Sequence, residues 1–141
     1  MKMFKPIALN EVNTFPFKSP QELITYASDK KQILIAVNAE KILHASTETK
    51  RIINGNIGYA DGIGAVMALK RKGEKESVKI PGCELWLEII REFYKSKSFY
   101  LVGSKQEIVE ATVAKLKIEF HNIQILNYRD GFIKTEEQNN L

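Results

Sequence analysis

Residues 59–73 read YADGIGAVMALKRKG, and this stretch predicts a strand end, a turn and a helix in direct succession. An aspartate and two glycines form the turn, and the helix is expected over residues 64–72. Gly73 then ends the helix, because glycine readily adopts the left-handed conformation found after a helix C-terminus. The helix in turn supports a strand over residues 56–60. A strand that leads directly into a helix is the repeating unit of an α/β protein.

The same alternation continues on both sides of this stretch. Ser19, with a proline and a glutamate after it, predicts the start of a helix. The apolar residues 32–37 are typical of a buried strand of a parallel sheet, and the apolar stripe of residues 81–95 places Trp86 in the core. Further helices are expected over residues 39–45, 47–54 with Thr47 as cap, and 104–120 with a capping box at Ser104, and further strands over residues 98–102 and 122–127.

Strands that alternate with helices in this way predict a parallel sheet with helical crossovers. We therefore expect an α/β fold with a Rossmann-like, mostly parallel sheet and flanking helices. A capping pattern at Thr135 predicts another helix that is only beginning where the sequence stops at Leu141. We accordingly expect a sheet that is incomplete at the C-terminus, with residues 1–141 forming the N-terminal portion of a single domain.

The composition is that of an ordinary globular protein, with 44% hydrophobic and 27% charged residues among 141. Cys83 is the only cysteine, which excludes an internal disulfide and a cysteine-based metal site and favours a reducing compartment. No apolar run approaches the roughly 20 residues that a membrane-spanning helix needs, and the N-terminus lacks the apolar core of a signal peptide. The expected location is the cytoplasm, with peripheral contact to the inner face of the cytoplasmic membrane as an alternative.

Several common classes of site have no support in the sequence. A dinucleotide fingerprint would need a glycine at Met67, and no phosphate loop of a nucleotide triphosphatase is present. His44 and His121 are isolated, so we expect no metal and no cofactor. The formal net charge of +4 suits an anionic partner, but its basic cluster at residues 70–72 lies where a helix C-terminus favours positive charge. We therefore expect no nucleic-acid partner.

Asp61 has two readings on these residues alone. As a helix N-cap it would accept hydrogen bonds from exposed amides, and this is the commoner role of an aspartate at such a position. As the residue that follows a parallel strand it would face the crevice where ligands of α/β proteins bind. The other loops that follow predicted strands begin near Asn38, Gly103 and Arg129.

Three stretches resemble the WecG/TagA/CpsF glycosyltransferases in order and approximate spacing. They are residues 34–41 (LIAVNAEK), 60–64 (ADGIG) and 79–86 (KIPGCELW). Residues 101–104 (LVGS) and 130–132 (DGF) resemble the family more weakly, and the chain can be matched from about Thr14 onward. The similar branch is the one that transfers N-acetylmannosaminuronic acid for enterobacterial common antigen, and other relatives use N-acetylmannosamine for the linkage unit of wall teichoic acid.

The resemblance implies an inverting enzyme of cell-envelope polysaccharide synthesis that moves an N-acetylmannosamine-type sugar from UDP to a polyprenyl-diphosphate-linked N-acetylglucosamine. It implies Asp61 as the general base. Its substrate-binding residues would be Asn38, Gly62, Gly64, Lys79, Gly103, Asp130, Gly131 and Phe132. Asn38 is equally consistent with a turn residue at a strand end.

Three residues depart from the family pattern: Ala36 replaces a common threonine, Lys79 the usual arginine, and Glu84 the usual aspartate. Lysine cannot form the bidentate hydrogen bonds with which arginine binds a diphosphate. The family's later segments, including a basic region tied to membrane docking, are not in this sequence. The alternative function is thus a truncated, inactive remnant that binds a UDP-sugar or a partner, and an unpaired sheet edge predicts self-association.

Overall fold

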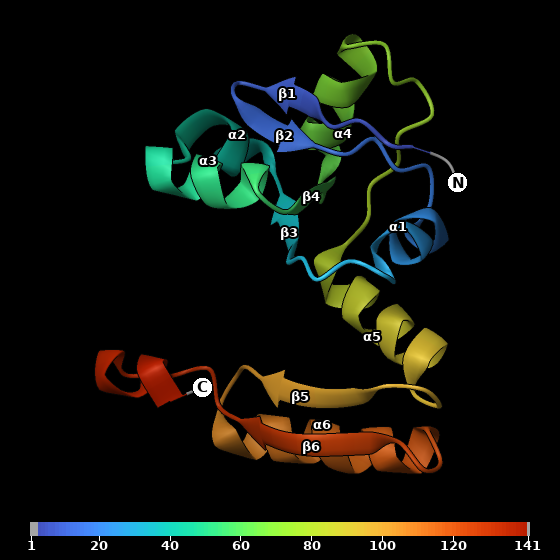
Figure 1. Cartoon of the computed structure of the whole chain (residues 1–141), viewed down its shortest axis with the longest axis vertical. Coiled ribbons are helices and arrows are strands. Elements are labelled where there is room, and N and C mark those ends of the chain that lie inside the picture. Colours follow the sequence, from blue (N-terminus) through green and yellow to red (C-terminus); the bar gives the residue numbers. More distant parts are fainter. Residues whose placement is uncertain (1–2, 141) are drawn as a thin grey trace. The chain divides into compact units, whose positions relative to one another are not determined.

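The computed structural model describes residues 3–140 (Figure 1). The chain divides into two compact units, Met1–Glu88 and Ile89–Leu141. The helix α5 (Gly82–Phe93) starts in the first unit and ends in the second. Both units combine strands with helices, which confirms the predicted α/β class.

In the first unit, β3 (Leu34–Val37) and β4 (Ile57–Ala60) form a parallel pair, in register from Leu34 opposite Ile57 to Val37 opposite Ala60. Phe15 bridges Tyr59 on the other edge of β4. Strand β4 is therefore flanked on both sides and is buried along its whole length. Strand β3 is thus the parallel strand expected within residues 32–37, but it is less buried than expected, since only Val37 is fully buried.

A short antiparallel hairpin of β1 (Ile7–Leu9) and β2 (Val12–Thr14) precedes the parallel pair. Its apolar side chains join two core clusters. Leu9 packs with side chains of β4 and α4, and Val12 packs with β3 and α3. The hairpin thereby connects the parallel strands to the helices on either side of them.

The helices of the first unit begin at capping residues. Helix α1 (Pro20–Ala27) starts after Ser19, whose side chain accepts from Glu22 N as predicted. Helix α3 (Thr47–Asn54) is capped by Ser46 and not by the predicted Thr47, because Ser46 has the extended backbone and its Oγ accepts from Thr49 N. The remaining helices that begin in this unit are α2 (Ala39–His44), α4 (Ile63–Arg71) and α5.

Trp86 lies on the exposed side of α5, with 41% of its surface accessible, so its predicted place in the core was wrong. Leu85 and Ile90 are the buried side chains of this helix, each 3% exposed. Successive helical residues point about 100° apart. A stripe centred on Leu85 therefore turns the neighbouring tryptophan toward the boundary of the buried face.

The second unit is built on another parallel pair, β5 (Ser98–Val102) and β6 (Gln124–Arg129), joined by α6 (Gln106–Glu119). Helix α6 buries Val109, Val113 and Leu116. The predicted capping box at Ser104 was wrong. Ser104 has a φ of 56° and follows Gly103 in a tight turn, so the N-cap position falls to Lys105. A 3₁₀ helix, η1 (Thr135–Asn140), occupies the segment where a new helix was expected.

Candidate active site

Two polar residues of the predicted site lie side by side at the carboxyl end of the first parallel pair. Asn38 follows β3 and Asp61 follows β4. The backbone N–H of Asp61 donates to the carbonyl of Val37 at 2.9 Å, which continues the ladder between the strands past their ends. This sheet edge is where ligands bind in open α/β proteins.

The Asp61 side chain does not cap the helix that follows it. The N-cap residue of α4 is Gly62, with a φ of 121° that a non-glycine residue rarely adopts, and no side chain bonds to the first turn. Asp61 Oδ2 instead accepts from Gly82 N, the first residue of α5, at 3.1 Å. The capping reading of Asp61 therefore fails for α4, and the carboxylate sits at the N-terminus of α5, where negative charge is favoured.

Only one carboxylate oxygen of Asp61 is engaged in this bond. Oδ1 has no hydrogen-bond partner within residues 3–140. The half-buried carboxylate is thus held in place by one oxygen, while the other can accept a proton or a hydrogen bond from a ligand.

Tyr59 is a member of this cluster that the sequence reasoning missed. A Cβ atom built on Gly82 would lie 2.8 Å from Tyr59 Oη, 3.2 Å from Asp61 Oδ2 and 3.8 Å from Ala36 Cβ. The phenol, the carboxylate and the start of α5 therefore meet at one point that only glycine fits. The sequence did carry a signal for Tyr59: side chains two residues apart in a strand point to the same face, so residues 59 and 61 could be expected to lie on one side of the sheet.

Burial raises the pKa of the Tyr59 hydroxyl above its ordinary value, and the neighbouring Asp61 carboxylate and Cys83 thiol act in the same direction. The phenol is therefore protonated at neutral pH. In this state the hydroxyl can donate a hydrogen bond.

Gly64 has a packing role of its own. A Cβ atom at this position would lie 2.9 Å from Ala39 Cβ, closer than carbon atoms normally approach. The glycine thus allows the first turn of α4 to contact the first turn of α2. This contact brings the segments that follow Asn38 and Asp61 together at the sheet edge.

Asn38 is the N-cap of α2, and its Oδ1 accepts from Lys41 N at 3.0 Å. Its Nδ2 has no partner in the described part of the chain and can donate to a ligand. Lys79 is exposed and forms no ion pair with any described residue. Ile80 N, next to Lys79, donates to Ala60 O at 2.8 Å, so the backbone of this segment runs beside the end of β4.

The other four predicted site residues cluster in the second unit, where they close the turns after β5 and β6. Gly131 N donates to Ser104 O at 2.9 Å, and a Cβ on Gly131 would lie 3.2 Å from Gly103 Cα. Asp130 Oδ1 accepts from Phe132 N at 2.8 Å. The Phe132 ring is 72% exposed and available for contact.

Residues 11–141 match the model of the Glycosyl transferase WecG/TagA/CpsF family. The chain belongs to this family. The resemblance on which the predicted site rested is thereby confirmed, and the protein is a glycosyltransferase of cell-envelope polysaccharide synthesis. Its reaction requires a sugar donor and an acceptor.

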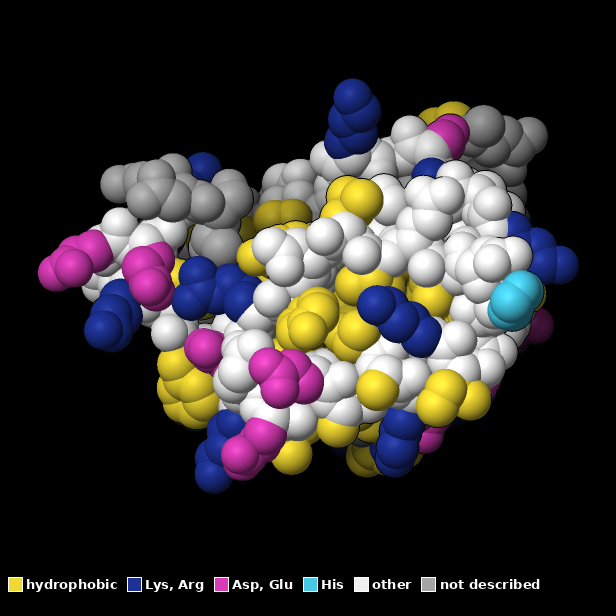
Figure 2. Space-filling model, turned by 90° about the horizontal axis from the view of Figure 1, so that it is seen from below, with side chains coloured by type: hydrophobic (Ala, Val, Ile, Leu, Met, Phe, Trp, Pro, Cys, Tyr) yellow, Lys and Arg dark blue, Asp and Glu magenta, His cyan; other side chains and the backbone are white. Residues whose placement is uncertain are grey.

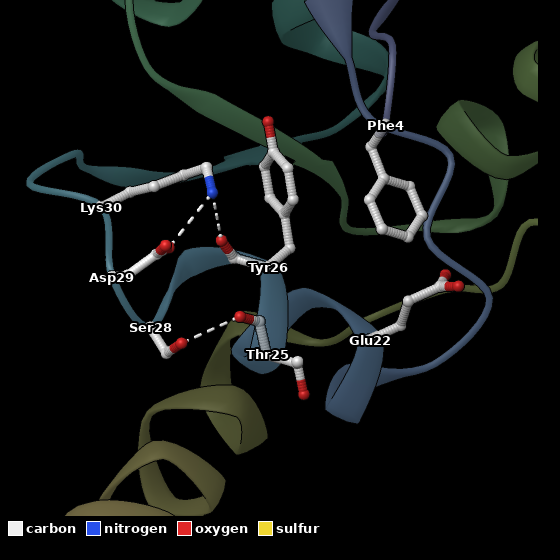
Figure 3. A pocket seen from close by; sticks show the side chains of 7 residues that line it. All are labelled: Phe4, Glu22, Thr25, Tyr26, Ser28, Asp29 and Lys30. Carbon is white, nitrogen blue, oxygen red and sulfur yellow. Dashed lines mark hydrogen bonds and ion pairs between the residues drawn. The ribbon is translucent and has the colours of Figure 1, made fainter. Parts of the chain in front are cut away.

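Two of the pockets formed by the described residues of this WecG/TagA/CpsF chain lie in the first unit. The one shown in Figure 3 has a volume of about 420 Å³ and lies along α1, with Phe4 and Tyr26 in its lining. Some of its polar groups bond to one another: Lys30 Nζ donates to Tyr26 O and Asp29 Oδ1, and Ser28 Oγ donates to Thr25 O. These groups are already paired with one another.

The other pocket, of about 380 Å³, lies between the β1–β2 turn, α2 and α4 and includes Gly64, Met67 and Arg71 in its lining.

Within residues 3–140, no helix is long and apolar enough to cross a membrane. The same residues contain no group of three or more His, Cys, Asp or Glu side chains arranged to hold a metal ion.

Proposed function

We propose that this glycosyltransferase moves an N-acetylmannosamine-type sugar, N-acetylmannosaminuronic acid or N-acetylmannosamine, from UDP to a polyprenyl-diphosphate-linked N-acetylglucosamine, with inversion at the anomeric carbon. Asp61 is the general base. The observation that carries this assignment is the Asp61 carboxylate at the end of β4, held through Oδ2 by Gly82 N and unpaired at Oδ1. Enterobacterial common antigen and wall teichoic acid are the products to which such a transfer contributes.

Inversion requires the acceptor hydroxyl to attack the anomeric carbon from the face opposite the departing UDP. A carboxylate on the acceptor side removes the hydroxyl proton as the new bond forms, which contributes about 10²- to 10⁴-fold to a rate. The position of Asp61 supports this role, because a fixed backbone bond restrains its orientation while one oxygen stays available.

Asn38, Gly62, Gly64 and Lys79 bind substrate around Asp61 in this proposal. The unpaired Nδ2 of Asn38 donates to a sugar hydroxyl. The amides of the first turn of α4, which no side chain caps, suit an anionic group of the nucleotide sugar. The Lys79 ammonium offsets charge on the diphosphate leaving group.

Gly103, Asp130, Gly131 and Phe132, in the turns after β5 and β6, are the substrate-binding residues that we propose for the second unit. We propose that both units are parts of one glycosyltransferase domain, because the family match runs through both of them. The exposed Phe132 ring can stack on a base or a sugar face.

The alternative is a chain that binds the UDP-sugar without transferring it. Ala36 favours this reading, because its methyl group borders the Tyr59 and Asp61 cluster where relatives often carry a threonine hydroxyl. Lys79 also favours this alternative, because a lysine in place of an arginine binds a diphosphate less tightly.

Self-association and peripheral membrane contact complete the proposal. Tyr100 and Val102 of β5 are 47% and 46% exposed, and Leu126 of β6 is 72% exposed. In Figure 2, hydrophobic side chains gather near the middle of the face shown, with Lys and Arg side chains among them. The apolar surface suits a second copy of the chain, and the net charge of +4 suits an anionic leaflet.

The deciding experiment is a transfer assay with UDP-N-acetylmannosamine, or its uronic acid, and a lipid-diphosphate N-acetylglucosamine acceptor. The anomeric configuration of the product is read by NMR. Transfer with inversion that disappears in Asp61→Asn supports the proposal. Donor binding without transfer supports the alternative, and a product of retained configuration contradicts the mechanism.

A further inference from the structure

Tyr59 carries a hydroxyl group that the fold buries without pairing. The side chain is 5% exposed, yet its Oη forms no hydrogen bond with any described residue. In the described part of the chain, Ser77 Oγ is the only side-chain polar atom that is both fully buried and without a hydrogen-bond partner. Because Tyr59 Oη has no partner either, it must retain some contact with solvent. An unpaired buried hydroxyl lowers the stability of a protein unless something else binds it.

The surroundings of this hydroxyl indicate what that partner is. Asp61 Oδ2 lies near it, and no positively charged side chain is among the atoms nearest to Gly82. A negatively charged ligand group would be repelled by the carboxylate. A neutral polyhydroxylated ligand can accept from the phenol and donate to the carboxylate, and a sugar ring provides both functions on adjacent carbons.

We propose that Tyr59 is a substrate-binding residue whose hydroxyl donates a hydrogen bond to an oxygen of the acceptor sugar, next to the hydroxyl that Asp61 deprotonates. This assignment rests on the proposed role of Asp61 as the base. The two side chains then bind the same sugar. The phenol extends from β4, and the carboxylate extends from the turn that follows β4. Gly82 keeps the space between them open, since any larger residue would contact both oxygens.

The melting temperature distinguishes a substrate-binding role of the Tyr59 hydroxyl from a structural one. If Tyr59 Oη stabilised the fold, Tyr59→Phe would lower the melting temperature. With no hydrogen bond to lose within residues 3–140, removal of an unpaired hydroxyl leaves the melting temperature unchanged or raises it.

The test uses the single cysteine of the chain as a binding reporter. Cys83 is exposed and directly follows Gly82, so an acceptor bound at Tyr59 shields its thiol from alkylation. The probe is N-acetylglucosamine diphosphate esterified to a short prenyl chain, with UDP-N-acetylmannosamine as the second ligand. The alkylation rate is measured against ligand concentration for the parent protein, Tyr59→Phe and the matched control Tyr26→Phe.

We expect Tyr59→Phe to raise the acceptor concentration for half-protection roughly two- to tenfold, the usual cost of one neutral hydrogen bond. Half-protection by the UDP-sugar and the melting temperature stay unchanged, and Tyr26→Phe behaves as the parent. An unchanged acceptor midpoint in Tyr59→Phe, a lack of acceptor protection in the parent, or a clear fall in melting temperature would each overturn the proposal. The base assignment fails separately, if Asp61→Asn retains turnover.

Discussion

Asp61 Oδ2 accepts a hydrogen bond from the backbone N–H of Gly82, at 3.1 Å and across 21 residues of sequence. This bond joins the end of the buried strand β4 to the first residue of α5. It gives the carboxylate a structural partner through one oxygen and leaves the other for a ligand. The structural and the chemical role of Asp61 are therefore separable by the choice of substitution.

Asp61→Asn should abolish most transfer without unfolding the protein. The amide oxygen of asparagine can still accept from Gly82 N, so the melting temperature stays within a few degrees, whereas turnover falls about 100-fold or more because an amide is not a base. Asp61→Ala removes the acceptor as well and should cost about 1 kcal/mol of unfolding free energy, the scale of a lost helix cap. Thermal unfolding and initial rates measure both effects. Near-normal turnover of Asp61→Asn would refute the assignment.

Lys79→Ala should weaken donor binding while leaving the fold intact. The side chain is exposed and forms no ion pair within residues 3–140. Its removal should therefore leave the melting temperature unchanged. Loss of its charge from the diphosphate should raise the Kd of the UDP-sugar about two- to tenfold, and Lys79→Arg should lower it. Calorimetric titration measures the affinity, and Lys75→Ala is the control because Lys75 is also an exposed lysine. Equal affinities for Lys79→Ala and Lys75→Ala would remove Lys79 from the site.

Gly58→Ala should destabilise the first unit strongly. A Cβ at this position in β4 would lie 2.5 Å from Asn13 O and 3.1 Å from side-chain carbons of Ile53 and Val37. The strands must then move apart, at about 1–3 kcal/mol of unfolding free energy. Gly55→Ala is the matched control, since its φ is −85° and its nearest neighbour is at 3.5 Å, and it should be neutral or slightly stabilising. Urea denaturation compares the two, and similar stabilities would contradict the packing of β4.

Alkaline pH should destabilise the protein partly through Tyr59. Its pKa is higher in the folded than in the unfolded state, mainly because of burial. Its contribution is therefore fully present below the unfolded pKa of about 10 and is lost as pH rises through the higher folded pKa. In Tyr59→Phe the free energy of unfolding should decline less steeply above about pH 10. Urea denaturation across this pH range, with phenolate absorbance as the titration signal, tests it, and identical slopes would count against the raised pKa.

Self-association should depend on the exposed face of β5. Val102→Glu places a charge on apolar surface that would face a second copy, and it should shift the sedimentation of the chain toward the monomer. Ser98→Glu tests whether a charge elsewhere on the same strand acts alike, since Ser98 is also exposed. A parent chain that sediments as a monomer at high concentration would contradict the proposed self-association.

The sequence by itself predicted the elements whose signals are local. The serine, proline and glutamate around residue 19 fixed the start of α1, and the strand, turn and helix of residues 57–71 were predicted to within a residue or two. These features depend on backbone conformation and on side chains a few residues apart. The family, and with it the kind of reaction, was also evident in the sequence, because it depends on short motifs in a fixed order.

Tertiary structure decided which side chains those elements bring together. The partner of Asp61 is Gly82 and not the helix next to it. The segment after Lys79 passes the end of β4, where Ile80 N donates to Ala60 O, and this places Gly82 N beside the carboxylate. Trp86 is exposed and Ser104 is no cap for similar reasons. Burial depends on what packs opposite a residue, and a turn can take a conformation that its neighbours impose. The approach of the start of α5 to Tyr59 and Asp61 likewise requires a glycine at position 82, and only the packed structure shows that these residues meet there.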